Sequence, residues 1–261
     1  MRDAVRRPPR NALRAFLERP ARVVLVLALA AAGVFGKIFE DVWNHESSSF
    51  DRSVALALHS LDSPFMDFSM RLFTFIGSLK VVVIVLAAAT VDALRRRDRR
   101  AVFALLSVFA AEEAMNFVLK HLVERPRPTL FEEIATLHTY SFPSGHAMTT
   151  AAVYGIIGVV VAREHPRLRR AISFGVPAIV FLVGLSRVFL GVHWPTDVLA
   201  GWAAGAILML IGCAFFLLPA RDGQLRTAAG HAGGAGRHPS EPWENPRFST
   251  SRNSPPEGDH S

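Results

Sequence analysis

Long apolar runs separated by short polar segments occupy most of the chain. A helix that crosses a lipid bilayer needs about 20 predominantly apolar residues. Six runs reach or approach this length, namely 23–36 with Ile38 and Phe39, 79–94, 101–119, 147–162, 171–185 and 198–218. The pattern therefore predicts an all-α integral membrane bundle of about six transmembrane helices, which forms one domain from residue 23 to residue 218.

Glycines recur in the last three of these runs, at positions 155, 158, 175, 184, 201 and 205. Small residues allow helix backbones to approach each other closely in lipid. We therefore expect these positions to lie at contacts between helices.

The segment 40–71 has a different pattern, in which acidic residues are mixed with apolar ones. Helices that lie in the membrane interface have one apolar face and one polar face. We expect one or two such amphipathic helices here, around Val54–Leu61 and Phe65–Phe75.

Both ends of the chain are polar. Residues 1–22 carry seven arginines and three prolines, which predicts a basic tail without a long helix. Residues 219–261 are rich in Gly, Pro, Ser and Arg and lack apolar periodicity, which is typical of a disordered tail. Small residues at 30–33 leave a cleaved signal peptide as an alternative, but the long basic region and the later spans favour a retained helix.

Basic residues concentrate in alternate connections of the predicted bundle, namely the N-terminal tail, 95–100 and 163–170. Cytoplasmic loops carry an excess of Lys and Arg. We therefore predict a multi-pass protein of the plasma (inner) membrane with both termini in the cytoplasm. The other two connections, which follow the third and fifth spans, would then share the outer or periplasmic face.

Composition agrees with a membrane protein. The chain is 51% hydrophobic with a mean hydropathy of +0.28, which is too apolar for an average soluble domain. A net charge of +7 can indicate nucleic-acid binding, but here the arginines flank apolar runs, so we expect no nucleic-acid partner. Cys213 is the only cysteine, which excludes an intramolecular disulfide and a Cys-based metal site. The sequence does not define an oligomeric state.

Three clusters of polar residues interrupt the apolar sequence between positions 120 and 197. They comprise Lys120, Arg127 and Pro128; Pro143, Ser144, Gly145 and His146; and Ser186, Arg187, His193 and Asp197. Cations and backbone donors can hold phosphoryl oxygens, one imidazole can attack phosphorus, and a second can protonate the leaving oxygen. The clusters therefore suit phosphoryl transfer without a metal ion or another cofactor.

Lys120 and Arg127 are candidate phosphate-binding cations. Only three of the 29 basic Lys and Arg residues are lysines, so a lysine at position 120 indicates a specific need for a compact ammonium rather than an interfacial anchor. Prolines on both sides of Arg127 fix the backbone there and favour a preset phosphate contact. We interpret the neighbouring Arg125 as an ordinary loop cation.

Ser144, Gly145 and His146 directly precede an apolar run. The start of a helix presents unpaired N–H groups and the positive end of the helix dipole. We expect Ser144 and Gly145 to donate to phosphate there, although the same residues would also serve as an ordinary helix cap. His146 at this position is a candidate general acid.

Arg187, His193 and Asp197 follow the fifth span. Each has a simpler alternative, because Arg187 could anchor the helix at the interface and Asp197 could cap the sixth helix. The joint spacing favours chemistry, since a carboxylate four residues after a histidine can hold one ring nitrogen and leave the other free to attack. Arg187 would be a third phosphate-binding cation.

Written as patterns, the clusters are K-x6-R-P, P-S-G-H and S-R-x5-H-x3-D in this order. In these blocks the chain resembles the type 2 phosphatidic acid phosphatase superfamily, which includes membrane lipid phosphate phosphatases, soluble bacterial acid phosphatases and vanadium haloperoxidases. The resemblance extends more loosely over residues 65–218. It implies that His193 is the nucleophile and forms a phosphohistidine intermediate.

We therefore expect hydrolysis of a phosphomonoester or pyrophosphate on a lipid of the polyprenyl pyrophosphate, phosphatidic acid or phosphatidylglycerol phosphate class. One alternative is a phosphotransferase that moves the phosphate to another hydroxyl. A second is a non-catalytic protein that binds or transports lipid phosphates, which would need neither His193 nor Asp197. A vanadate-dependent oxidase is disfavoured, because known relatives of that kind are soluble.

Ionisable residues also occur within the third span, where they are costly and usually paired. Glu113, Asn116 and Lys120 fall on one helical face and could form a group that orients the lysine. Alternatively, Glu112 pairs with a neighbouring helix.

Overall fold

The computed structural model describes residues 20–130 and 139–217, and within these ranges all regular structure is helical. In chain order the elements are α2 (Pro20–Trp43), α3 (Ser48–His59), α4 (Pro64–Ile76), α5 (Leu79–Arg95), α6 (Arg99–Val123), α7 (Gly145–Thr149), the π-helical turn η2 (Thr150–Tyr154), α8 (Gly155–Glu164), the 3₁₀ turn η3 (Pro166–Leu168), α9 (Arg169–Phe189) and α10 (Pro195–Leu217). The expectations for the two tails concern residues that are almost all outside the described ranges.

Five helical segments are long and apolar enough to cross a membrane, namely α2, α6, the α7–α8 stretch, the η3–α9 stretch and α10. The pair α4 and α5, bent by 47° at its junction, gives a sixth if it is taken as one broken span. The predicted all-α membrane bundle is therefore confirmed. The apolar run 79–94 forms the single helix α5 as predicted, but its bent junction with α4 was not indicated by the sequence.

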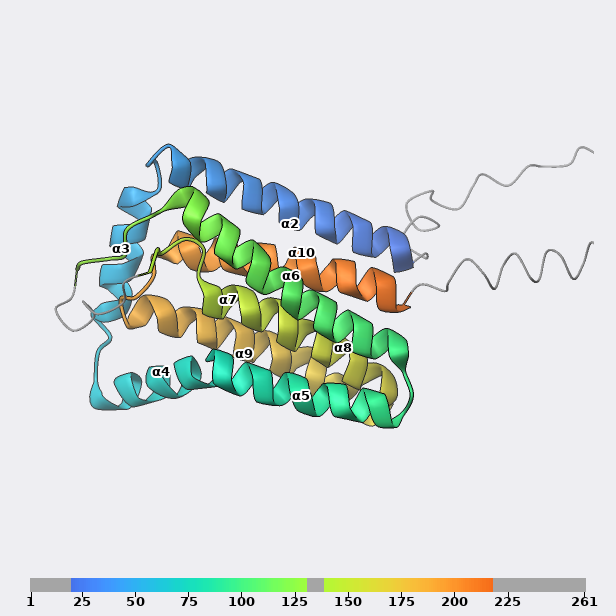
Figure 1. The fold of residues 1–261 in the computed structure, drawn as a ribbon. Helices are drawn as coiled ribbons and strands as arrows, with labels where there is room; N and C mark the ends of the chain where they lie inside the picture. The colour runs from blue at the N-terminus through green and yellow to red at the C-terminus, as the bar shows by residue number, and fades with distance from the viewer. Residues whose placement is uncertain (1–19, 131–138, 218–261) are drawn as a thin grey trace, which may run out of the picture. The chain divides into compact units, whose positions relative to one another are not determined.

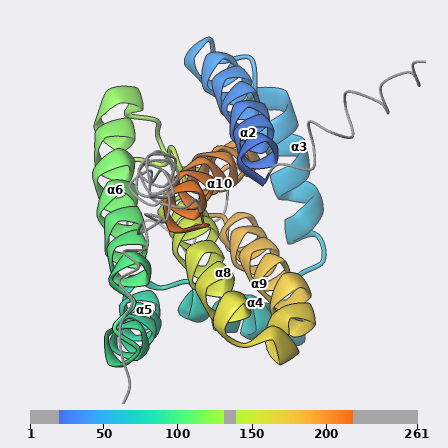
Figure 2. The same ribbon diagram turned by 90° about the vertical axis from the view of Figure 1, so that its right-hand side faces the viewer.

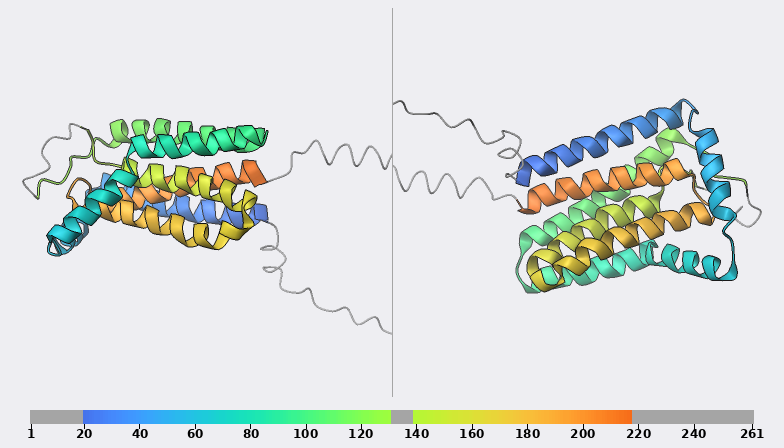
Figure 3. Two further views of the ribbon diagram at one scale, coloured as in Figure 1. Left: turned by 90° about the horizontal axis from the view of Figure 1, so that it is seen from below. Right: turned by 180° about the vertical axis from the view of Figure 1, so that it is seen from behind.

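The junction between α4 and α5 packs against the bundle. Gly77 follows α4, and a Cβ atom there would collide with Val183 of α9 and lie 3.3 Å from Cδ2 of His146. The absence of a side chain at Gly77 thus allows the bend to approach both α9 and the start of α7. Figure 3 shows α4 turning away from the direction of α5. The segment predicted as an interfacial helix is therefore also part of the wall beside His146.

α10 lies between α2 and α6 and contacts both, as the view along the bundle shows (Figure 2). It also contacts α7 through two glycines spaced four residues apart. A Cβ atom at Gly201 would lie 2.7 Å from the Ser144 carbonyl oxygen, and one at Gly205 would lie 2.5 Å from that of Met148. Close helix approach is thus confirmed at these glycines but is wrong for Gly175, where a Cβ atom would meet nothing within 4 Å.

The connections between helices gather at two opposite ends of the bundle (Figure 1). At one end Arg96 donates to Glu164 Oε2 at 3.1 Å and lies 2.8 Å from Nε2 of His165, so the two basic connections are adjacent. At the other end α3 crosses the bundle beside the segments that follow α6 and α9. The structure thus places the basic connections and the polar clusters at opposite ends, as the charge pattern predicted.

Candidate active site

The three polar clusters meet at the end of the bundle that α3 crosses. Lys120 Nζ donates to the Pro143 carbonyl at 3.1 Å, which joins the first cluster to the second. Ser144 N donates to the Asp197 carbonyl at 3.0 Å, which joins the second to the third. The structure therefore brings into one site residues that are separated by more than one membrane span.

His193 lies in the short turn between α9 and α10. Gly191 allows this turn with a φ of 64°, a left-handed conformation that glycine adopts without strain. Asp197 is in the first turn of α10, where its Oδ2 accepts from Trp194 N at 2.8 Å and from the Ser141 hydroxyl. His193 Nδ1 is 3.6 Å from the same Oδ2, so the spacing of four residues brings the two side chains together.

The surroundings of His193 favour one protonation state. Its Nε2 lies 3.3 Å from Arg127 Nη1, and a guanidinium can only donate, so Nε2 must act as the acceptor. The ring proton is then on Nδ1, facing Asp197. Burial lowers the pKa of His193 to about 4 although Asp197 opposes the shift, so the imidazole is neutral at neutral pH. In this tautomer Nε2 carries no proton and therefore has the lone pair that attack on phosphorus requires.

Arg127 and Lys120 are held by backbone carbonyls. Arg127 donates to Thr139 O at 2.8 Å and to Val192 O at 2.6 Å, which fixes its guanidinium beside His193. Lys120 Nζ donates to Tyr140 O at 2.7 Å as well as to Pro143 O. An ammonium has three donors, so one direction is left for an anion.

Arg187 is buried at the end of α9, with only 7% of its surface exposed. Its Nη1 donates to Thr74 Oγ1 at 3.1 Å, so α4 helps to orient it. Its Nε is buried and has no hydrogen-bond partner among the described residues. The bent α4–α5 pair therefore contributes to the site through both Thr74 and Gly77.

Ser144 precedes α7 and Gly145 begins it. The Ser144 hydroxyl is buried and has no hydrogen-bond partner among the described residues. A Cβ atom at Gly145 would lie 2.7 Å from Asn116 Nδ2, so a side chain there would displace the Asn116 amide of α6. His146 lies next, within electrostatic range of Arg187 and His193.

These features suit an anion. A buried polar atom without a partner costs free energy comparable to a lost hydrogen bond. Ser144 Oγ and Arg187 Nε are both such atoms, and both can donate. A phosphoryl group would satisfy them and would offset the positive charge of the three cations. No group of three metal-ligating side chains is found in the part of the chain that the structure describes.

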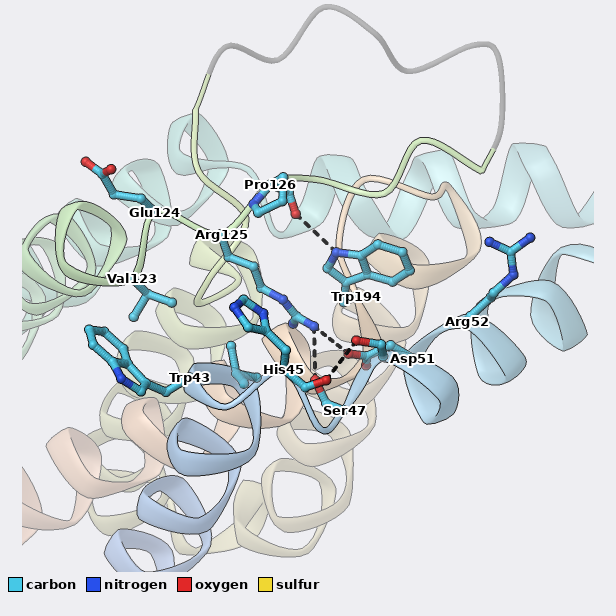
Figure 4. Close-up of a pocket in the computed structure, with 12 residues that line it drawn as sticks. Trp43, His45, Ser47, Asp51, Arg52, Val123, Glu124, Arg125, Pro126 and Trp194 are labelled. Atoms are coloured by element: carbon cyan, nitrogen blue, oxygen red, sulfur yellow. Dashed lines mark hydrogen bonds and ion pairs between the residues drawn. The ribbon is translucent and has the colours of Figure 1, made fainter.

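Arg125 is more than the loop cation that the sequence indicated. It reaches from the segment after α6 and donates to Asp197 Oδ1 at 2.6 Å. Its hydrogen bond to Asp51 Oδ2, also 2.6 Å long, is drawn in Figure 4. Asp51 comes from α3 and is fully buried. No pattern in the sequence relates position 51 to position 125. Asp51 also lies before the amphipathic helix expected around Val54–Leu61, whereas the structure begins this helix at Ser48.

Glu112 and Glu113 have different environments. Glu112 is buried and accepts from Thr149 Oγ1 of α7 at 2.9 Å, so the alternative in which it pairs with a neighbouring helix holds. Glu113 is exposed. The idea that Glu113 belongs to a group that orients Lys120 is therefore wrong.

The fold and the site together define a class of protein. It is a helical multi-pass membrane protein with a basic, histidine-containing site at one end of its bundle. The family model of the PAP2 superfamily matches residues 101–218. The chain belongs to this superfamily. The matched range contains all three clusters and excludes Asp51 and Thr74.

Similar proteins of this superfamily include phosphatases. Phosphatidylglycerophosphatase B of Bacillus subtilis is 31% identical over 184 residues, which cover 68% of this chain and 86% of that protein. Decaprenylphosphoryl-5-phosphoribose phosphatase of Mycobacterium tuberculosis is 32% identical over 157 residues, covering 59% and 82%. The crystal structure of a transmembrane PAP2 type phosphatidylglycerolphosphate phosphatase from Bacillus subtilis superposes with a TM-score of 0.63 at 28% identity, over 74% of this chain and 94% of that chain.

Proposed function

We propose that the protein is a metal-independent membrane phosphatase that hydrolyses a phosphomonoester or a pyrophosphate on a lipid. The observation that carries the proposal is the buried imidazole of His193, with Nδ1 toward Asp197 and Nε2 toward Arg127, beside donors that lack partners. Membership of the PAP2 superfamily and the phosphatase relatives support the reaction class.

In the first step, the substrate phosphoryl group takes the place in front of His193. Arg127, Arg187 and Lys120 hold its oxygens together with Ser144 and Gly145, and the negative charge that spreads over these oxygens is stabilised by the fixed cations. Nε2 of His193 forms a bond to phosphorus while the bond to the leaving oxygen breaks. His146 gives its proton to that oxygen.

In the second step, water hydrolyses the phosphohistidine. His146, now neutral, takes a proton from the water as the water oxygen attacks phosphorus. The bond between phosphorus and Nε2 breaks, inorganic phosphate leaves, and His193 regains its lone pair. Asp197 stabilises the positive charge that the imidazole carries while phosphorylated.

We propose that the site faces the outer or periplasmic side of the plasma membrane and acts on lipids of that leaflet. The support is the separation of the basic connections from the site together with the tendency of basic loops to stay in the cytoplasm. The names of the two relatives support a lipid-linked phosphate. A pyrophosphate offers more oxygens to three cations than a monoester, so we favour a polyprenyl pyrophosphate.

The test is phosphate release by the purified protein from polyprenyl pyrophosphate, phosphatidic acid and phosphatidylglycerol phosphate, with EDTA present. We expect activity to persist with the chelator and to be inhibited by vanadate, which mimics five-coordinate phosphorus. Activity that disappears with EDTA and returns with a divalent ion would refute the metal-independent reaction. Binding of the lipid without any phosphate release would instead indicate a binding or transport protein.

A phosphotransferase would share the first step. Adding a second lipid or sugar hydroxyl as acceptor and analysing the products separates the two reactions. We expect free phosphate to remain the main product.

A further inference from the structure

A buried chain of charged side chains ends at Asp197. Its central member is the guanidinium of Arg125, which bridges Asp51 Oδ2 and Asp197 Oδ1 with two 2.6 Å hydrogen bonds. Figure 4 shows the Asp51 half of this bridge. The side chains of Asp51 and Asp197 are 1% and 0% exposed, and that of Arg125 is 13% exposed. Ion pairs buried this deeply are costly to build and strongly destabilising when one partner is removed.

Asp51 also holds the start of α10. Its Oδ1 accepts from Thr196 N at 2.9 Å and its Oδ2 accepts from Thr196 Oγ1 at 2.8 Å. Thr196 is the second residue of α10, where backbone N–H groups have no partner within the helix. α3 therefore caps α10 from outside, one residue before Asp197.

We propose that Asp51 and Arg125 are positioning residues that orient the Asp197 carboxylate toward His193. Arg125 fixes Oδ1, while Trp194 N and the Ser141 hydroxyl fix Oδ2, so the carboxylate cannot rotate away from His193 Nδ1. This proposal rests on the phosphatase activity proposed above, because the purpose of the orientation is to support His193 as a nucleophile.

Asp51 also has an electrostatic effect that supports His193 as a nucleophile. Arg125 and Asp197 alone would form a neutral pair, and Asp51 adds a negative charge that shares the guanidinium. The group of three keeps a net negative charge near His193. That charge stabilises the imidazole while it carries the phosphoryl group, so removing Asp51 should weaken the first step rather than substrate binding.

The first test compares Asp51→Asn with Asp62→Asn, which changes an exposed carboxylate after α3. Asparagine keeps the shape and the acceptor for Thr196 N but loses the charge. We expect Asp51→Asn to lower kcat about tenfold or more with KM within about threefold of wild type, while Asp62→Asn changes neither. A kcat for folded Asp51→Asn within about twofold of wild type would overturn the proposal.

The second test uses the cavity of about 490 Å³ that is lined by Arg125, Asp51 and Trp194 on the side away from Asp197. A guanidinium ion is small enough to enter it. Guanidinium, at concentrations that do not unfold the protein, should raise the kcat of Arg125→Ala by about tenfold or more. Equal concentrations of urea or sodium chloride should not raise it. Absence of rescue in folded Arg125→Ala would contradict a positioning role for the guanidinium.

Arg125→Lys covers the case in which Arg125→Ala does not fold. A single ammonium cannot replace a fork that spans two carboxylates, so we expect folded Arg125→Lys to lose about tenfold in kcat. Activity of Arg125→Lys equal to that of wild type would overturn the proposal.

A measurement that does not depend on turnover separates this proposal from the proposed function. ¹⁵N spectra of histidine-labelled wild type should show the Nδ1–H tautomer of His193, and Asp51→Asn should show a mixture of tautomers. A wild-type protein that hydrolyses no lipid phosphate refutes the phosphatase function. An unchanged tautomer in Asp51→Asn refutes the positioning role, whatever the activity.

Discussion

The backbone N–H of Ser144 donates a 3.0 Å hydrogen bond to the backbone carbonyl of Asp197. The turn that begins α7 and the first turn of α10 are therefore joined directly, and each carries side chains of the candidate site. This bond places the proposed phosphate donors and the carboxylate behind His193 in one rigid arrangement.

Replacing His193 by alanine should abolish turnover. His193→Ala is expected to lower kcat by about 10⁴-fold or more, and Asp197→Asn to lower it by a similar factor because it favours the wrong tautomer. Phosphate release from lipid substrates in detergent is the measurement. His121→Ala is the matched control, because His121 is exposed near the end of α6, and it should stay within about twofold of wild type. His193→Ala with activity within tenfold of wild type would refute the mechanism.

His193 should take up a proton only at a pH well below the range in which a histidine ordinarily titrates. The folded protein holds the pKa of His193 at about 4 through burial, whereas an unfolded histidine titrates near 6.5. The unfolded chain therefore binds the proton first, and stability is lost as the pH falls from about 6.5 toward 4. A ¹⁵N-histidine titration, assigned by comparison with His193→Gln, measures this directly. A His193 signal that titrates near 6.5 would show that the site does not shield the ring.

Ser144→Ala should separate function from stability. The hydroxyl is buried without a partner among the described residues, so its removal should not lower the free energy of unfolding, while kcat/KM should fall by about 10²-fold through the loss of a phosphate donor. Thr149→Val is the contrasting variant, because the Thr149 hydroxyl donates to buried Glu112 and its loss should destabilise by about 1–3 kcal/mol. Thermal unfolding and kinetics on the same preparations check both. A Ser144→Ala protein with wild-type kcat/KM would remove Ser144 from the site.

Gly201→Ala should move α10 away from α7. The new Cβ atom would lie 2.7 Å from the Ser144 carbonyl oxygen, so we expect a loss of about 1–3 kcal/mol in stability and reduced activity. Gly175→Ala is the matched control, since nothing lies within 4 Å and alanine favours a helix by about 1 kcal/mol. Unfolding midpoints in one detergent give the comparison. Equal effects of the two substitutions would mean that the contact at Gly201 is loose.

Accessibility of cysteines should report the orientation. In a Cys213→Ser background, Asp62→Cys lies in the connection between α3 and α4 and Arg167→Cys in the connection between α8 and α9, and both original side chains are exposed. An impermeant thiol reagent on intact cells should label position 62 and not position 167, because basic connections stay in the cytoplasm. Both should react in permeabilised cells. The reverse pattern in intact cells would place the site in the cytoplasm.

Much of this architecture was predictable, because a membrane restricts the structures that a chain can form across it. Apolar runs of sufficient length indicated the spans, and the alternation of basic connections placed Lys120 and His193 at the same end of the bundle. The roles assigned to the candidate site residues remain predictions. The variants of His193, Asp197 and Ser144 test three of them, and His146 as general acid stays a prediction.

The unpredicted features depend on contacts between distant segments. The pairing of Asp51 with Arg125 joins α3 to the segment after α6, and neither residue is unusual for its local sequence. The bend after α4 depends on the fit of Gly77 against Val183, which only the packed helices define. Burial of a charge cannot be inferred from its neighbours in the chain when its partner lies on another helix.

The position of Asp197 on α10 has a consequence for biosynthesis. α10 follows all the other described helices in the chain, so it leaves the ribosome and enters the membrane after them. Until it does, His193 lacks its carboxylate, Arg125 lacks its acceptors Asp197 and Thr196, and the Ser144 N–H lacks its acceptor. A nascent chain with the earlier spans already inserted therefore carries the cations and both histidines without Asp197, and the proposed active site is completed only by the insertion of this helix.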